Sequence, residues 1–115
     1  MALAAVSPCA YAEAGSKIDW NALELTTNQC DSLQTLDSEW KNIYSDLYPQ
    51  IQSDRAKLRR LMNDPAADDQ QVLALQSHLQ QSEQRLRSEA TRIFMLKKNY
   101  LSPEQKRRLY QMMEN

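Results

Sequence analysis

The longest stretch of the chain without Gly or Pro runs from about residue 68 to residue 100. Within it, apolar side chains recur every seventh residue, with two more at the interleaved position, which is typical of a helix that packs one narrow apolar stripe against a partner helix. At a rise of 1.5 Å per residue this helix would span about 45–50 Å, so we expect an elongated molecule with an equally long partner. The stripe consists of Val72, Leu75, Leu79, Leu86, Ile93, Leu96 and Tyr100.

The composition favours helices over every other fold class. The 115 residues include a single Gly, Gly15, and four Pro, which leaves little for tight hairpin turns or phosphate-binding loops. The formal net charge is −1, with acidic and basic residues mixed along the chain. This mixing predicts neither a nucleic-acid partner nor a polybasic membrane patch. We therefore predict one all-α domain, too short to bury a large core alone.

The first twelve residues have the features of the second half of an export signal. They carry no charge and end in Ala10-Tyr11-Ala12, a small-x-small pattern typical of signal peptidase cleavage. The basic front region of such a signal is missing, and an Ala-rich cytosolic N-terminus is the alternative. We expect an exported protein, with residues 13–24 as an N-terminal arm that lays Trp20 on the body. No other apolar run approaches the roughly 20 residues of a membrane span.

A capping box predicts the start of an earlier helix. Thr26 can accept a hydrogen bond from the backbone N–H of Gln29, and the Gln29 side chain can reach back to the N–H of Thr26. Apolar residues then follow at steps of three and four. Pro49 cannot donate to the preceding turn, so we expect this first arm to be kinked or split there. The apolar positions are Leu33, Leu36, Trp40, Ile43 and Leu47 before Pro49, and Ile51, Leu58, Leu61 and Met62 after it.

The connection between the two helices is short. Asn63-Asp64-Pro65 ends the first arm and residues 66–69 lead into the second, so the helices must run antiparallel. With the turn centred near residue 64 or 65, Thr26 faces roughly residue 103 and His78 faces roughly residue 51. Ion pairs three or four residues apart are expected on the exposed faces: Asp37 with Lys41, Glu83 with Arg87, and Glu89 with Arg92.

A second capping box lies where this register places it. Residues 101–105 repeat residues 25–29 as Leu, hydroxyl cap, two residues and Gln, with Ser102 as the cap and Gln105 closing the box. Pro103 takes the first helical position, where its missing N–H costs little. The sequence thus predicts two equivalent helix starts side by side at the open end of the hairpin, with a short C-terminal helix after the second.

These two boxes carry a resemblance to a known family. With Leu25, Thr26 and Gln29 in LTTNQ and Leu101, Ser102 and Gln105 in LSPEQ, the domain of residues 25–115 resembles the Spy/CpxP family of periplasmic stress proteins. In that family, paired L-T-x-x-Q motifs flank a long-helix hairpin. The Pro-split first arm, the short acidic turn and the terminal helix match as well, and Ser102 replaces a Thr.

The resemblance implies a cradle-shaped homodimer in the periplasm that needs neither ATP nor another cofactor. Such a protein holds unfolded or misfolded envelope proteins as a chaperone of the holdase type. The alternative that the family implies is a stress-responsive or metal-responsive accessory that modulates a membrane sensor kinase, since related members act in heavy-metal resistance. A purely structural coiled-coil adaptor is a third interpretation.

The residues themselves favour self-association and weak binding of unfolded chains. Residues 93–96 are apolar on every side of the helix, and Tyr44 and Tyr48 add more apolar surface than one helix–helix contact can bury. We therefore expect a second copy of the chain to cover this surface. Long basic side chains beside exposed apolar residues can bind unfolded segments through their charge and through contact with apolar surface. Many such charges, however, are explained as the solvated faces of helices. The client-binding candidates are Arg55, Leu58, Arg59, Leu61, Met62, Arg85, Phe94 and Met95.

Neither a metal site nor a catalytic site is predicted. His78 and Cys30 are the weak metal candidates, but the hairpin register separates them by roughly 30 Å along the arms. We expect His78 to be a surface residue, and Cys30 to be a buried inert thiol or to form an intermolecular disulfide. Ser77 beside His78 has no third partner that would orient the imidazole, so we do not expect an enzyme.

Overall fold

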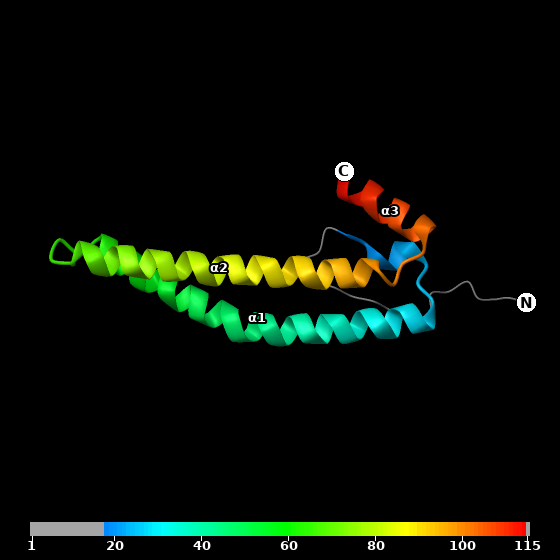
Figure 1. Cartoon of the computed structure of the whole chain (residues 1–115), viewed down its shortest axis with the longest axis horizontal. Coiled ribbons are helices and arrows are strands. Elements are labelled where there is room, and N and C mark those ends of the chain that lie inside the picture. The colour runs from blue at the N-terminus through cyan, green and yellow to red at the C-terminus, as the bar shows by residue number, and fades with distance from the viewer. Residues whose placement is uncertain (1–17, 115) are drawn as a thin grey trace, which may run out of the picture. The chain divides into compact units, whose positions relative to one another are not determined.

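The computed structural model describes residues 18–114, and every regular element in that range is a helix. The elements are a 3₁₀ helix η1 (Trp20–Leu23) and the α-helices α1 (Thr27–Met62), α2 (Asp69–Lys98) and α3 (Pro103–Glu114) (Figure 1). The all-α prediction is confirmed, as are the long-helix hairpin and the short C-terminal helix. The predicted export signal of residues 1–12 and residues 13–17 of the predicted arm lie outside the described residues.

The chain forms two compact units, which we describe separately. Unit 1 comprises the residues up to Ser38 together with those from Phe94 onward, and unit 2 is Glu39–Ile93. Unit 1 therefore contains η1, the first turns of α1, the last turns of α2 and all of α3. Unit 2 contains the rest of the two long helices and the turn that joins them.

In unit 2 the helices α1 and α2 run antiparallel, side by side (Figure 1). Their seam buries Ile51, Leu79 and Ile93. Most other stripe residues are only half-buried: Ile43, Leu47, Leu58, Leu61, Val72, Leu75 and Leu86. The stripe was predicted to extend to Met62 and Tyr100, but Met62 is 69% exposed and Tyr100 is 49% exposed. Both lie at or beyond a helix end, where the apolar repeat no longer faces a partner.

The first arm was predicted to be kinked or split at Pro49, and the structure shows that it is not split there. Pro49 lies inside α1, and Tyr48 before it is helical as well. Proline removes one backbone donor and crowds the preceding turn, at a cost of about 3 kcal/mol in a helix interior. The helix nevertheless continues, because stripe residues on both sides of Pro49, Leu47 and Ile51, are held in the seam with α2.

The turn of the hairpin is closed by side-chain caps. The Asn63 side chain donates to the carbonyl of Arg59 at 2.9 Å at the end of α1. Asp64 accepts from the backbone N–H of Ala66, and Asp68 accepts from that of Gln70, each at 2.9 Å. The short acidic turn is thus confirmed. Basic residues in the last turns of both long helices and Asp69 in the first turn of α2 complement the helix dipoles.

Most of the ion pairs at these positions join the two long helices rather than neighbouring turns of one helix. Only the predicted pair of Glu89 and Arg92 forms, at 2.9 Å. The other two expectations are wrong, because each carboxylate meets a cation of the opposite helix: Asp37 pairs with Lys97 at 2.8 Å, and Glu83 pairs with Arg55 at 2.5 Å. The register was predicted to within one helical turn, since His78 meets Asp54 rather than residue 51.

Candidate functional site

The core of unit 1 fixes where the two helix starts lie. Leu25 and Leu101, the first residues of the two boxes, are 2% and 6% exposed, and both belong to this core. Ile18, Phe94 and Met112 pack against it. The buried members of the cluster are Trp20, Leu23, Leu25, Cys30, Leu33, Leu101 and Leu109. Apolar anchoring of each box thus sets the position of the polar groups beside it.

Both predicted capping boxes are formed. In the first, the N–H of Gln29 donates to the Thr26 hydroxyl at 3.1 Å, and the N–H of Thr26 donates to Gln29 Oε1 at 2.9 Å. In the second, the N–H of Gln105 donates to the Ser102 hydroxyl at 3.2 Å, and the N–H of Ser102 donates to Gln105 Oε1 at 2.9 Å. The two helix starts satisfy their first backbone donors in the same way.

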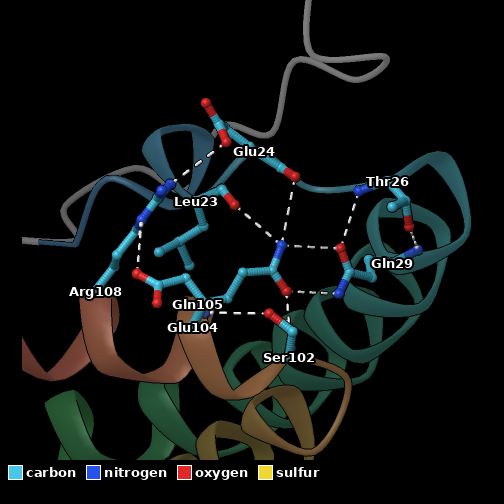
Figure 2. Close-up of a pocket in the computed structure, with 8 residues that line it drawn as sticks. All are labelled: Leu23, Glu24, Thr26, Gln29, Ser102, Glu104, Gln105 and Arg108. Carbon is cyan, nitrogen blue, oxygen red and sulfur yellow. Dashed lines mark hydrogen bonds and ion pairs between the residues drawn. The ribbon is translucent and has the colours of Figure 1, made fainter.

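The two closing glutamines also bind each other (Figure 2). Gln29 Nε2 donates to Gln105 Oε1 at 2.7 Å, and Gln105 Nε2 donates to Gln29 Oε1 at 3.1 Å. Each Nε2 also donates to the backbone: that of Gln29 to the Tyr100 carbonyl at 2.8 Å, and that of Gln105 to the Leu23 carbonyl at 3.0 Å. We call this reciprocal pair the glutamine clamp. Both amides use their donors and acceptors fully.

The sequence predicted the two boxes side by side but not the clamp between them. A signal was present, because both boxes close with Gln. Glu can close a capping box equally well, but two carboxylates facing each other would repel, whereas two amides can donate and accept at once. The clamp ties η1 and α3 to the start of α1, since Gln105 reaches the backbone beyond η1.

A pocket of about 320 Å³ opens beside the clamp in unit 1. Glu24 lies at its edge in the left-handed region, with φ 57° and ψ 57°. Arg108 of α3 approaches Glu24 at 3.4 Å and Glu104 at 3.7 Å (Figure 2). The lining residues are Leu23, Glu24, Thr26, Gln29, Ser102, Glu104, Gln105 and Arg108. Their polar groups are largely used by one another, so the pocket is a by-product of the clamp.

A buried lysine closes the other side of the unit 1 core. Lys97 is 2% exposed, its Nζ lies 2.8 Å from Asp37 Oδ1, and it stands 4.3 Å above the Trp20 ring. Trp20 in turn packs edge to face on Phe94, with the ring centroids 6.4 Å apart. The prediction that Trp20 lies on the body is confirmed. Phe94, a client-binding candidate, is partly buried and packs against this core.

The structure divides the remaining client-binding candidates into inward-facing and exposed groups. Leu58 and Leu61 are half-buried, and Arg55 is bound to Glu83, whose hydrogen bond raises the pKa of the guanidinium. Met62 and Met95 are 69% and 55% exposed. Arg59 and Arg85 are also exposed, and within residues 18–114 neither has an ion-pair partner. The exposed candidates are therefore Arg55, Arg59, Met62, Arg85 and Met95, of which Arg55 is held by Glu83.

The weak metal candidates lie in separate units and are both engaged. His78 Nε2 lies 3.4 Å from Asp54 Oδ2, and Asp54, itself 7% exposed, also accepts from Gln50 at 3.3 Å. Cys30 is fully buried and disulfide-bonded. The expectation of an inert thiol is therefore wrong, because a disulfide sulfur offers no thiolate to a metal. Within the described part of the chain, no three His, Cys, Asp or Glu side chains gather as a metal site.

Unit 2 carries a surface feature that was predicted only as apolar area beyond what one seam needs. Trp40, Tyr44 and Tyr48 follow one another along α1 at steps of four, with ring centroids 5.8 Å and 4.7 Å apart. The two tyrosine rings are nearly parallel, at 14°. Tyr44 remains 38% exposed, and desolvation, followed by the influence of Tyr48, raises the pKa of its hydroxyl. We call these three side chains the aromatic ladder.

Comparison with protein-family models, with curated proteins and with solved structures finds no match to this chain. Residues 18–114 contain no helix whose length and apolar character would let it cross a membrane.

Proposed function

We propose that the protein is an ATP-independent holdase of the Spy/CpxP type, which binds unfolding proteins in the periplasm and acts as a homodimer. The observation that carries the proposal is the surface of unit 2. There, Met62 and Leu73 are 69% and 57% exposed, and Tyr44 adds aromatic area. Isolated exposed apolar residues are ordinary, but here they share the unit with several unneutralised cations.

These cations favour unfolded chains as the bound partner. Within residues 39–93, no carboxylate lies within ion-pair distance of the following exposed side chains: Lys41, Lys57, Arg59, Arg60, Arg85 and Arg87. Long basic side chains combine apolar stems with a charged head, so they hold mixed polypeptide segments weakly and without a fixed shape. Such a surface requires no cofactor, which fits a holdase better than a catalyst.

A further observation supports the assembly. The seam of unit 2 has only three buried apolar side chains, which leaves apolar surface that a second copy would cover. Sedimentation of the full chain at twice its own mass is the expected result for the dimer.

The test is light scattering during dilution of a chemically unfolded client into buffer with stoichiometric full-length protein. Nucleotide is omitted and a chelator is present. We expect the protein to suppress aggregation, and the double variant Met62→Ser/Leu73→Ser to suppress it less. Met113→Ser serves as the matched control, because Met113 is 52% exposed but belongs to unit 1. Scattering equal to that with an unrelated bystander protein would overturn the holdase proposal.

A further inference from the structure

The aromatic ladder is preformed for stacking. Tyr44 and Tyr48 already lie nearly parallel at 4.7 Å, and Trp40 supports Tyr44 from the other side at 5.8 Å and 56°. Trp40 and Tyr48 are half-buried, whereas Tyr44 is 38% exposed. Tyrosine and tryptophan offer large contact areas with few torsions to restrict, so a fixed ladder loses little entropy when another ring binds.

Within residues 18–114, Lys41 is the unpaired cation that lies nearest to the ladder in the sequence. Lys41 precedes Tyr44 by one turn, and its predicted partner Asp37 binds Lys97 instead. No carboxylate of residues 18–114 lies within ion-pair distance of Lys41. Glu39 is held by Arg92 at 2.5 Å, and Asp46 is two residues from Tyr44, a spacing that points away from it on a helix. A carboxylate bound near Tyr44 would therefore meet an unneutralised cation.

From this stacking geometry and charge we propose that the aromatic ladder binds extended segments of non-native protein in which an aromatic side chain adjoins a carboxylate. The ring of the segment packs against the exposed edge of the ladder at Tyr44, and the carboxylate pairs with Lys41. This inference rests on the proposed holdase function and names the class of segment that the holdase recognises. An aromatic pair is worth about 0.5–1.5 kcal/mol beyond its buried area, which corresponds to a preference of roughly two- to tenfold.

The experiment measures fluorescence anisotropy of dye-labelled disordered peptides with the full-length protein. One peptide carries Phe beside Asp, a second has Leu in place of Phe, and a third has Lys in place of Asp. We expect the Phe-Asp peptide to bind about two- to tenfold more tightly than the Leu peptide, and more tightly than the Lys peptide as well. The variant Tyr44→Leu/Tyr48→Leu, which keeps apolar area but removes the rings, should abolish the Phe preference. Lys41→Gln should abolish the Asp preference alone.

Matched controls separate this inference from its premise. Met62→Ser/Leu73→Ser changes exposed apolar residues of the same unit outside the ladder and should leave the Phe preference intact. Equal affinities for the Phe and Leu peptides, with aggregation still suppressed, would overturn the ladder inference and keep the holdase. A ladder variant that sediments as a monomer while peptide preference is unchanged would assign the ladder to the dimer interface instead. Failure of every peptide, together with unsuppressed aggregation, would overturn the proposed function itself.

Discussion

Each of the two units of this chain is stabilised internally in a different way. Of the ten buried apolar side chains among residues 18–114, seven lie in unit 1 and three in unit 2. Unit 1 adds the paired amides of the glutamine clamp, while unit 2 adds exposed ion pairs such as Arg55 with Glu83. Unit 1 is thus specified by burial and by bonds between residues far apart in sequence, whereas unit 2 depends on a regular, half-buried seam.

This difference bears on function, because a surface that binds unfolded chains must keep apolar side chains outside. Regions with few buried apolar contacts are also those that open most readily. The aromatic ladder and the exposed Met62 and Leu73 lie in the unit with the thinner core, while unit 1 also exposes Met95, Tyr100, Tyr110 and Met113. Under the proposed holdase function, unit 2 is therefore set apart by its thinner core and its ladder rather than by a larger number of exposed apolar side chains.

The largest effect should come from the core of unit 1. Leu109→Ala removes a side chain with no exposed surface and should lower the free energy of unfolding by about 2–5 kcal/mol, because the cavity adds to the lost transfer energy. Leu86→Ala in the half-buried seam of unit 2 should cost only roughly 1–2 kcal/mol. Urea unfolding followed by circular dichroism measures both. Equal costs would break the contrast between the units.

The glutamine clamp should come next. Gln105→Ala leaves the Leu23 carbonyl without its donor and removes one of the two partners of each polar atom of the Gln29 amide. An unsatisfied buried polar group costs about 1–3 kcal/mol. Gln111→Ala on the exposed surface of the same helix α3 is the matched control and should change stability by less than about 0.5 kcal/mol.

A double-mutant cycle sharpens this test. Because Gln29 and Gln105 bind each other directly, the cost of Gln29→Ala/Gln105→Ala should fall short of the sum of the single costs by about 1 kcal/mol. Strict additivity would show that each glutamine stabilises only its own capping box. The comparison of the units would then rest on apolar burial alone.

Most of the local structure could be predicted from the sequence because its signals are local. The two capping boxes, the acidic turn and the heptad stripe each depend on residues within one or two turns of one another. The boxes at Thr26 and Ser102, the antiparallel hairpin and the short helix α3 were all predicted correctly. The pairing of the two helix starts followed from the register of the hairpin, although that register was shifted by less than one turn.

The features that were missed depend on competition between local and distant partners. Asp37 has Lys41 one turn away, yet it binds Lys97 of α2, and the choice depends on the packing distance between helices. Pro49 has a strong local preference to break a helix, which the seam residues around it overcome. The glutamine clamp required the relative position of two side chains about 76 residues apart in sequence, which a residue pattern alone does not provide.

The two caps should have a moderate and similar effect. Thr26→Ala and Ser102→Ala each remove a hydroxyl that accepts from a glutamine N–H, and each should lower stability by about 1 kcal/mol. Thr27→Ala is the control, since Thr27 neighbours the first cap without belonging to the box. Thermal unfolding measures all three variants. If melting is unchanged in both cap variants, the boxes do not contribute to the stability of unit 1.

The smallest expected effect is a gain in stability on replacing Glu24. Glu24 is exposed and adopts φ 57°, a left-handed conformation that costs a non-Gly residue roughly 1 kcal/mol. Glu24→Gly relieves this cost but gives the unfolded chain more freedom, so we expect a net stabilisation of roughly 0.5 kcal/mol in thermal unfolding. Glu24→Ala loses the same 3.4 Å contact with Arg108 without relieving the backbone, and should not stabilise. A loss of stability in both variants would mean that the Arg108 contact outweighs the backbone cost, and that unit 1 also depends on a surface ion pair, as unit 2 does.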